Sequence, residues 1–506
     1  MHPDRIDSRN VPKLVGADFE LANFIQGLER AGGTGHDASE ALLAEIEGVP
    51  ASGGGRTYTA GSYVWGAGSA YGWSQDQGRK FLATNGGCAY IDLDHLELCI
   101  PEVRSAFDHA AASMAMLRIA RRAQVAANEH LPEGQSLQVL VNNSDGRSNS
   151  YGSHLNFLVS RDAWDDILER RPHYLQFLAA HQLSSMIYSG QGKVGSENDR
   201  PDVAYQISQR ADFIETTTGT QTTYRRPIVN SRDENLCGKA DGLARLHVIF
   251  FDNTLCSGAS VLKVGAMQIV LALLEAQAID GTLGIDVPVA ASVTWSHDPT
   301  LQAKVRLVDG GEATALGVQR RILETAQKHH ATRGLPGVPR ADEILALWED
   351  TLDKLAARDF DALVGRLDWV LKQQILERAL EADADLSWKA PQLEYLNQIY
   401  SSLDPAEGLY WSYARAGLVE DWVSEEAVTR FEHEPPEDTR AWTRARLLRH
   451  VPAESIEKVD WDHIRLSVDE RGFRRHVEVR LDDPLGFTRE HTAHLFDEGA
   501  TQRSNS

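Results

Sequence analysis

The stretch NGGCAYIDLDHLELCIPE, residues 85–102, places more ionisable side chains together than a core strand normally carries. Alternation at period two over Cys88–Leu93 puts Tyr90 and Asp92 on one face of a strand. Four further groups follow closely in the chain: Asp94, His95, Glu97 and Glu102. A buried charge has to be paired or bound to a metal, so the stretch is a candidate metal or acid–base site. A solvated strand end with ordinary surface acids explains the same residues equally well at this point.

A second pair of carboxylates stands near the N-terminus. In Val11–Asn23 (VPKLVGADFELAN), Asp18 and Glu20 lie two residues apart, so a strand turns both side chains to the same side. Neighbouring carboxylates repel each other unless a cation lies between them. The pair therefore fits a metal site, although a solvent-facing strand edge is the commoner explanation for these two residues alone.

A polar strand and a basic cluster complete the candidate chemistry. Ser153–Arg161 (SHLNFLVSR) leaves the turn-rich loop 142–152 and alternates so that His154, Asn156 and Leu158 share a face. On its own, His154 fits a structural histidine better than a ligand. Guanidinium groups bind phosphate through two hydrogen bonds, while local salt bridges explain each arginine singly. The cluster consists of Arg210, Arg225, Arg226 and Arg232.

Strands and helices are expected around these segments. Ser105–Asn128 and Val261–Gln277 have helical spacing, whereas Ser136–Val141 and Arg245–Asp252 resemble strands. Residues 25–80 contain SGGG and a run rich in Gly, Ser and aromatics, and are expected to form an insertion or mobile loop. The double proline at 435–436 indicates a boundary. The expected organisation is a catalytic domain over residues 1–425, a small C-terminal domain over 426–498 and a disordered tail over 499–506.

The composition excludes several classes of protein. The chain has 506 residues and a formal net charge of −22, which argues against broad binding to a nucleic acid backbone. Its four cysteines form no CxxC pair, so we do not expect a structural zinc site. The low cysteine count is typical of a protein in the reducing cytoplasm. The N-terminus lacks an apolar core typical of a signal peptide. No apolar run reaches the roughly 20 residues that a membrane span needs, so no membrane contact is expected.

Taken in order, these segments resemble one family, the Pup ligase and the deamidase of Pup, which belong to the carboxylate–amine ligase group related to glutamine synthetase. NGGCAYIDLDHLELCIPE resembles the family pattern of NG, an aromatic residue two before Asp, then H-P-E and P-E. GADFEL stands where the family has Gly followed by E-x-E, and SYGSHLNFL is similar to SYG-HENYL. The resemblance covers about residues 14–465. Other collinear matches are ISQRADFIE, RRPIVNSRDE, RLHVIFFDNTL, LKVG, HDPTLQAKV, LSWKAPQLEYL, EGLYWSYARAG and EPPEDTRAWTR.

The resemblance implies an α+β fold. Its centre would be a curved antiparallel sheet like that of glutamine synthetase, cradling ATP and Mg²⁺ and packed with helices, with a small C-terminal domain beside it. It implies Asp92 as the catalytic aspartate. Metal ligands would be Asp18, Tyr90 and Glu97 at one ion, with Glu20 and His154 at a second. Groups facing phosphates or the substrate carboxylate would be Arg210, Arg226, Arg232 and, beside them, Asn156.

The implied activity has two forms. A deamidase would use Asp92 to attack an amide, or to activate a water that does, at the C-terminal Gln or Glu side chain of a small ubiquitin-like protein modifier. A ligase would transfer the γ-phosphate of ATP to a C-terminal Glu, and a lysine or small amine would then attack the acyl phosphate. Family deamidases carry an extra loop before the catalytic aspartate, and the Gly-rich insertion between Glu20 and Asp92 favours this form. ADFIETTTGTQTT also favours the deamidase, whereas RRPIVN favours the ligase.

The chain departs from the family pattern at several positions. Asp18 replaces Glu, Leu96 replaces Pro, and Leu155 replaces the Glu of HEN, which we expect to remove a charge from the site. The run Asn235–Lys239 lacks the family's His, and Ser257 replaces an acidic residue. These changes indicate a divergent member. A catalytically inactive paralogue that only binds the modifier is the third hypothesis.

Overall fold

An antiparallel sheet organises the chain. The computed structural model describes residues 10–30, 33–51, 77–234, 236–237, 242–279, 281–470 and 473–496. Within these residues the sheet has eight strands in the order β12-β7-β1-β5-β4-β3-β2, and β6 pairs with the second half of β1. The strands are β1 (Val15–Gln26), β2 (Val49–Pro50), β3 (Gln77–Phe81), β4 (Cys88–Asp92), β5 (His95–Cys99), β6 (Ser136–Leu140), β7 (Ser153–Ser160) and β12 (Leu243–Val248).

The two faces of the sheet differ because its strands alternate. On β1, Ala17, Phe19 and Leu21 are buried in the main hydrophobic cluster, whereas Asp18 and Glu20 point to the opposite face. The apolar face therefore contacts helices, and the polar face is available for a site. This confirms the expected antiparallel sheet with helices packed against it.

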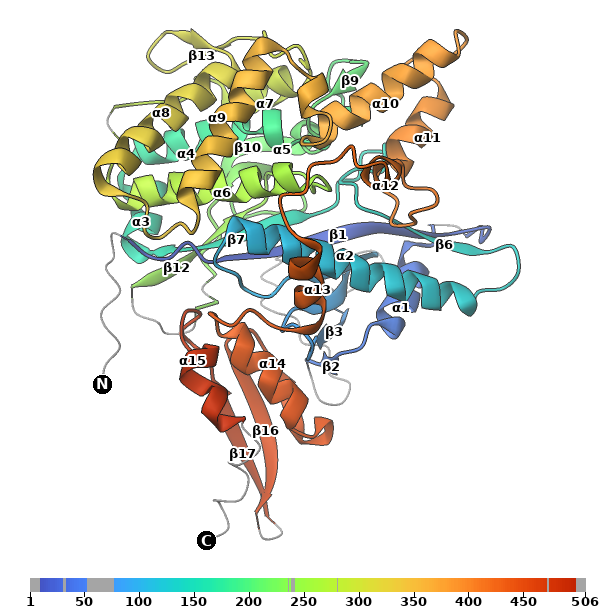
Figure 1. Cartoon of the computed structure of the whole chain (residues 1–506), viewed down its shortest axis with the longest axis vertical. Helices are drawn as coiled ribbons and strands as arrows, with labels where there is room; N and C mark the ends of the chain where they lie inside the picture. The colour runs from blue at the N-terminus through green and yellow to red at the C-terminus, as the bar shows by residue number, and fades with distance from the viewer. Residues whose placement is uncertain are drawn as a thin grey trace.

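Helices cover the apolar face (Figure 1). The α2 helix begins at Ser105, whose side chain accepts a hydrogen bond from the Asp108 backbone N–H. Its alanine-rich face packs on the sheet and on α6. The helices of this layer are α2 (Ala106–Glu129), α3 (Arg161–Asp165), α4 (Pro172–Ser184), α5 (Met186–Ser189), α6 (Ser257–Glu275), α7 (Pro288–Ser296), α8 (Ala315–Arg333), α9 (Ala341–Ala357), α10 (Asp368–Ala382), α11 (Pro391–Ile399), α12 (Leu409–Arg415) and α13 (Glu425–His433).

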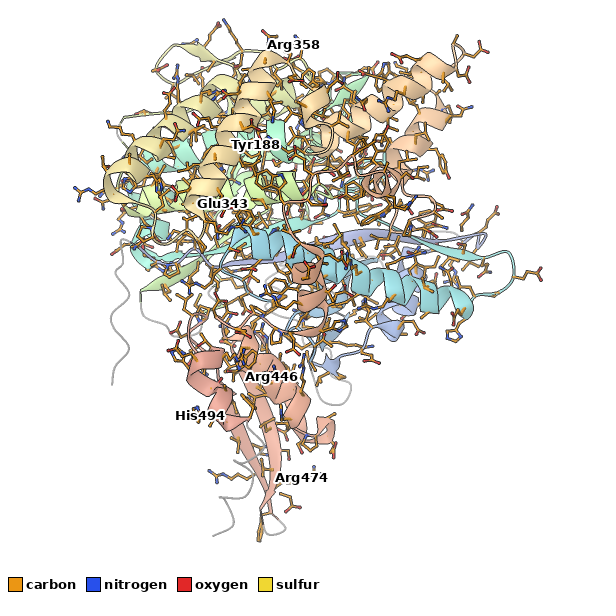
Figure 2. All side chains as sticks on the ribbon, in the orientation of Figure 1. Tyr188, Glu343, Arg358, Arg446, Arg474 and His494 are labelled. Carbon is orange, nitrogen blue, oxygen red and sulfur yellow. The ribbon has the colours of Figure 1, made fainter. Side chains whose placement is uncertain are left out.

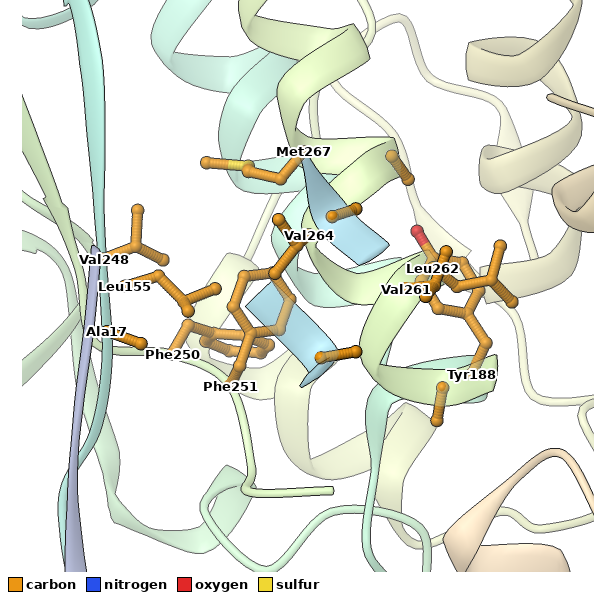
Figure 3. Packing of buried hydrophobic residues seen from close by; sticks show 14 of the residues in the cluster. Ala17, Leu155, Tyr188, Val248, Phe250, Phe251, Val261, Leu262, Val264 and Met267 are labelled. Atoms are coloured by element: carbon orange, nitrogen blue, oxygen red, sulfur yellow. The ribbon is translucent and has the colours of Figure 1, made fainter. Parts of the chain in front are cut away.

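The α6 helix is the centre of the core. Its 19 residues are long and apolar enough to cross a membrane, so the expectation that no run reaches this length was wrong. However, 94% of this stretch is buried inside the protein, as in the core helix of a globular fold. Figure 3 shows Val264 and Met267 of α6 beside Phe250, Phe251 and Leu155.

Short strand pairs flank the sheet. The parallel pair β10 (Ile214–Gly219) and β11 (Arg226–Asn230) leads into the loop that carries Arg232. The other pairs are β8 (Lys193–Val194) with β9 (Tyr205–Gln206), and β13 (Val305–Arg306) with β14 (Glu312–Ala313).

A C-terminal unit lies on the polar side of the sheet (Figure 1). It has its own small core, in which Leu448, Ile456 and Ile464 pack against Phe81 of β3. Figure 2 shows Arg446 on α14 near the sheet and Arg474 close to the far end of the strand ribbon. Its elements are α14 (Ala441–His450), β15 (Ile456–Val459), β16 (His463–Glu470), β17 (Phe473–Arg480) and α15 (Arg489–Thr492).

The predicted boundary at residue 426 assigns α13 to this unit, but the structure packs α13 elsewhere. Val428 and Phe431 belong to the main cluster, and α13 lies against α2. The small unit therefore begins at about α14. The predicted tail at 499–506 lies outside the described residues.

Buried ion pairs join the C-terminal unit to the sheet. Glu102 accepts hydrogen bonds from Arg440 Nε at 2.7 Å and from Arg444 Nη1 at 3.1 Å. All three side chains are at most 10% exposed. Burial opposes ionisation of Glu102, but the two guanidinium groups outweigh it and lower its pKa to about 2. Glu102 follows β5 in the chain, so its ion pairs hold α14 against this edge of the sheet.

The predicted insertion over residues 25–80 is only in part a loop. Among the described residues, 25–26 end β1, α1 (Gly35–Glu45) packs on β1 and α2, and β2 pairs with β3. Leu42 and Leu43 of α1 are buried in the main cluster, which is why this segment is held in place. The Gly-rich part, residues 52–76, lies outside the described residues.

Candidate active site

A cavity of about 400 Å³ lies between the polar face of the sheet and the C-terminal unit. This volume is within the usual range for a small-molecule site. Its walls come from the strands β1, β4, β5, β7 and β12, from the loop after β11, and from the C-terminal unit. The lining includes acidic side chains, among them Asp18, Asp92 and Glu97, and basic side chains. The basic ones are Arg79, Arg232, Arg245, Arg440 and Lys458.

Strand register brings the predicted carboxylates together. Glu97 of β5 is opposite Glu20 on one side and Tyr90 on the other. Asp18 is opposite His154 of β7. Pairs directly opposite on neighbouring strands have side chains within contact distance. Residues far apart in the sequence thus meet because β1 is flanked by β5 and β7.

Asp18 is held by two partners on β7. Its Oδ2 accepts from His154 Nδ1 at 2.8 Å, and its Oδ1 accepts from Asn156 Nδ2 at 2.8 Å. Burial opposes ionisation, but the charge and hydrogen bond of His154, with His247 next, hold the pKa of Asp18 below its ordinary value. A metal bound at Nε2 of His154 would take the place of the ring's second proton, while Nδ1 keeps its hydrogen bond to Asp18.

Glu97 carries the opposite shift. Burial, followed by repulsion from Asp18, Asp92 and Glu20, raises the pKa of Glu97 well above its ordinary value. Three of these carboxylates line the cavity and Glu20 lies beside them, so they repel each other, and a divalent cation between them would remove this repulsion. Ligand atoms lie within 4.8 Å of one another in two groups that share Glu97: Asp18, Glu97 and His154, and Glu20, Asp92 and Glu97.

Both groups fit divalent cations, since carboxylate oxygens and one imidazole are suitable donors for Mg²⁺ or Mn²⁺. The division of ligands between the two candidate metal sites differs in one detail from the division that the resemblance implies. His154 is hydrogen-bonded to Asp18, not grouped with Glu20, and Glu20 Oε2 is 3.0 Å from His95 Nδ1.

Burial and the nearby Glu97 carboxylate raise the pKa of the Tyr90 phenol well above its ordinary value, so Tyr90 stays neutral. Arg79 lies over the Tyr90 ring at 4.0 Å.

Asp92 ends β4 at a tight turn whose backbone is strained. Leu93 has φ 54°, the left-handed region, and is not glycine. The next carbonyl, of Asp94, accepts a hydrogen bond from Ser39 Oγ of α1 at 2.7 Å. The Leu96 N–H donates to Asn23 Oδ1 at 3.0 Å, a bond that the family's proline could not make. Helix α1 and β1 therefore fix the direction of Asp92.

Gly152 allows Glu20 and His154 to approach each other. A Cβ at this position would lie 2.6 Å from Glu20 Oε1 and 3.0 Å from His154 Cε1. Its carbonyl also accepts from the Glu20 N–H at 3.1 Å. The glycine in SYGSH is thus required, because any side chain at this position would collide with Glu20 and His154.

The predicted arginines are separated by the fold. Arg232 lines the cavity, but Arg210 and Arg226 do not. Arg210 is 1% exposed and donates to the carbonyls of Tyr151 and Ile249, and burial, then the nearby Arg226, lowers its pKa to about 10. Both arginines interact electrostatically with Glu20, so they lie near this carboxylate although they do not line the cavity.

Two functional side chains on β12 were missed. Arg245 Nη1 donates to Asn156 Oδ1 at 2.9 Å, and His247 Nδ1 donates to the same oxygen at 2.8 Å. Both line the cavity, and Asn156 therefore links them to Asp18. Their spacing could have revealed them, because Arg245 and His247 stand two residues apart in a segment that was predicted only as a strand.

No local sequence pattern predicted that the C-terminal unit would form one wall of the cavity. Arg440, Lys458 and Trp461 line the cavity although they lie more than 300 residues from Asp92 in the chain. Their contribution depends on how two units dock, which the Glu102 ion pairs determine.

The expectation that Leu155 removes a charge from the site was wrong. Leu155 points to the helical face, where it packs with Val248 and Phe250 (Figure 3). Its neighbours His154 and Asn156 point into the cavity. In the Asn235–Lys239 segment, Leu236 and Cys237 line the cavity, and residues 235 and 238–239 lie outside the described residues. Ser257 begins α6 and donates to the Glu420 carbonyl at 3.0 Å, a structural role.

The profile of one protein family, Pup-ligase protein, matches residues 56–465. A depupylase of Acidothermus cellulolyticus is 36% identical over 418 residues, 82% of this chain and 80% of the relative. A Pup–protein ligase of Acidimicrobium ferrooxidans is 37% identical over 391 residues, 76% and 83% of the two chains. The structure of the Pup ligase PafA in complex with ADP superposes with a TM-score of 0.73 at 27% identity, covering 85% of this chain and 91% of that one.

Proposed function

Because the chain belongs to the Pup-ligase protein family and is an ATP-dependent carboxylate–amine enzyme of the Pup pathway, we propose that it is an ATP- and Mg²⁺-dependent amidase. Its substrate would be the side-chain amide, or the isopeptide, at the C-terminal Gln or Glu of Pup or a Pup-like modifier. Proteins that carry the modifier would be the second group of partners, and the location would be the cytoplasm.

One observation carries this proposal. Asp92 lines the cavity together with Glu97, within 4.8 Å of ligand atoms of Glu97 and Glu20, on a turn that α1 and β1 hold in place. We assign the cation to the group of Asp18, Glu97 and His154, so that the Asp92 carboxylate acts on the substrate. Asp92 is the best placed for that role, since it ends its strand at the cavity.

The chemistry of the amidase follows from these residues. Asp92 either attacks the side-chain carbonyl carbon or takes a proton from a water that attacks it. The amide nitrogen leaves with a proton, as ammonia from Gln or as the lysine amine from an isopeptide, and one water is consumed. Asp18, Glu97 and His154 would hold Mg²⁺, which would neutralise charge on phosphate oxygens and polarise the carbonyl.

The basic walls would bind the nucleotide. Arg232 and Arg245 line the cavity near Asp18 and present guanidinium groups suited to phosphate. Trp461 and Lys458 of the C-terminal unit offer an apolar surface and a further cation for the remainder of ATP. Arg210 and Arg226 would act from behind Glu20, through their charge.

A ligase is the alternative, and the 37% identical Pup–protein ligase favours it. In that case Asp92 would take a proton from the attacking lysine, and ADP and phosphate would form with each product. The Gly-rich insertion before Asp92 and the depupylase relative favour the amidase. A catalytically inactive modifier-binding paralogue is the second alternative.

The test uses the purified protein with Mg-ATP and Pup ending in Gln. The amidase converts the amide to the acid without net ADP formation, and Asp92→Asn abolishes the conversion. ADP formed only when Pup ending in Glu and an amine are both present would identify the ligase. Binding of Pup without either reaction would identify the inactive paralogue.

A further inference from the structure

Two of the four cysteines face each other across neighbouring strands of the sheet. Cys88 of β4 is directly opposite Cys99 of β5 in the strand register. Both residues are free thiols, and they are 0% and 4% exposed. A hydrogen bond between the two side chains, followed by burial, raises the pKa of Cys99 well above its ordinary value. The two sulfur atoms are therefore in contact.

The geometry of this pair suits a disulfide. Residues directly opposite in antiparallel strands have Cα atoms roughly 4.5–5.5 Å apart, and disulfides join Cα atoms that are roughly 4.4–6.8 Å apart. The Cβ atoms of such pairs are about 4.5–5.5 Å apart, whereas a disulfide holds them at about 3.8 Å. Formation of the bond would therefore draw β4 and β5 together locally by roughly 1 Å.

A small oxidant can reach one of the two thiols. Cys99 lines the cavity of the candidate active site, whereas Cys88 does not. The cavity, of about 400 Å³, is much larger than a hydroperoxide group. A third cysteine, Cys237, also lines the cavity, but it packs in a different hydrophobic cluster from Cys88 and Cys99. Cys99 is thus the thiol at which oxidation would begin, and Cys88 is its partner.

The cysteine pair lies beside the candidate metal ligands. Cys99 is two residues from Glu97 on β5, so both side chains point to the polar face of the sheet. On the other side of Cys99, Asp18 of β1 is directly opposite in the register. Because β5 lies between β4 and β1, drawing Cys99 toward Cys88 moves it away from Asp18. A disulfide would therefore change the spacing of the ligands that Glu97 and Asp18 provide.

We propose that Cys88 and Cys99 form a reversible disulfide when a hydroperoxide enters the cavity, and that this bond weakens cation binding at Asp18, Glu97 and His154. The Cys99 sulfur attacks the O–O bond, which breaks, giving a sulfenic acid and releasing an alcohol, or water from hydrogen peroxide. The Cys88 sulfur then displaces the sulfenic oxygen, which leaves as water, and the S–S bond forms. The two thiols lose two electrons and two protons, which the peroxide takes up. A thiol reductant reverses the reaction, as is typical of disulfides in a reducing compartment.

The first experiment is mass spectrometry of the wild-type protein after treatment with hydrogen peroxide. Free thiols are labelled with N-ethylmaleimide in denaturant, and the protein is then digested with trypsin. Both cysteines fall in one tryptic peptide, residues 81–104, so the disulfide lowers its mass by two hydrogen atoms and prevents its labelling. Because the raised pKa keeps Cys99 in the less reactive thiol form, the exposure should last for hours. Dithiothreitol should restore two labelled thiols.

Three results of this experiment would overturn the proposal. They are two labelled thiols after prolonged oxidation, a sulfinic acid in peptide 81–104, and a disulfide that joins Cys99 to Cys237. Cys88→Ala should abolish the loss of two hydrogen atoms. Cys237→Ala is the matched control, because Cys237 is also buried and lines the cavity, and this variant should keep the loss. The wild-type peptide decides the matter if Cys88→Ala does not fold.

Calorimetric titration with Mn²⁺ tests the consequence for the metal site. Changes beside a metal ligand typically lower affinity by roughly 10- to 100-fold, so the oxidised protein should bind Mn²⁺ at least about tenfold more weakly than the reduced protein. Reduction, followed by removal of the reductant, should restore the affinity. Equal affinities of the two forms would refute the coupling. Absence of Mn²⁺ binding by the reduced protein would instead refute the candidate metal site, on which the proposed function also rests, whereas the mass of the peptide alone decides the disulfide.

Discussion

Replacing Glu102 by Gln should destabilise the protein strongly and change how its stability depends on pH. The folded pKa of Glu102 is about 2, against an ordinary value of 4.5. At about 1.36 kcal/mol per pH unit, this difference corresponds to about 3 kcal/mol of stability. The same order, about 3–5 kcal/mol, is typical when one partner of a buried ion pair is removed. Here two guanidinium groups, of Arg440 and Arg444, would lose their carboxylate.

The sign of the pH effect follows from the lowered pKa. The contribution of Glu102 is complete above pH 4.5 and is lost as the pH falls toward 2. The difference in the free energy of unfolding between wild type and Glu102→Gln should therefore be about 3 kcal/mol at pH 7, and about 2 kcal/mol at pH 3.5.

Urea unfolding at several pH values measures this difference. Glu437→Gln is the matched control, since its ion pair with Arg489 is exposed, with side chains 57% and 55% accessible. Such a pair contributes less than about 1 kcal/mol. If Glu102→Gln lowered the free energy of unfolding no more than Glu437→Gln at pH 7, the role of Glu102 in docking the C-terminal unit would be refuted.

Three further predictions concern the site itself. Glu97→Gln should raise the Tm of the metal-free protein, because burial and then repulsion from neighbouring carboxylates raise the pKa of Glu97. It should also weaken Mn²⁺ binding measured by calorimetry, and unchanged binding would exclude Glu97 as a ligand. Gly152→Ala should lower kcat and metal affinity together, since the new Cβ meets Glu20 Oε1, and an unaffected metal titration would contradict the close approach. Ser39→Ala should lower kcat about tenfold with little change in the KM for ATP, because it releases the Asp94 carbonyl; a change confined to KM would refute a positioning role.

Alternation along strands made part of the site predictable. Asp18, Glu20, Tyr90, Asp92, His154 and Asn156 were assigned to strand faces from spacing alone, and the fold does turn them to the polar side. Which strands are neighbours was not visible in the spacing. The resemblance implied an antiparallel sheet without naming its neighbouring strands, and the register of β1 with β5 and β7 decides which side chains meet.

Other features depend on long-range packing. The basic cluster predicted from sequence proximity divides in space, since Arg232 reaches the cavity while Arg210 is committed to backbone carbonyls. Leu155 was assigned to the site because it replaces the Glu of the family's HEN motif, although alternation alone places it on the other face. Trp461 enters the cavity only because a separate unit docks there.

The central claim is that Asp92 hydrolyses the C-terminal side-chain amide of Pup. The most direct measurement is mass spectrometry of Pup ending in Gln after incubation with Mg-ATP and the wild-type protein or Asp92→Asn, with ADP assayed in parallel. We expect amide-to-acid conversion by the wild type without stoichiometric ADP, and at least about a 100-fold lower rate for Asp92→Asn. Equal conversion by both proteins, or none by the wild type although it binds ATP and Pup, would contradict the account.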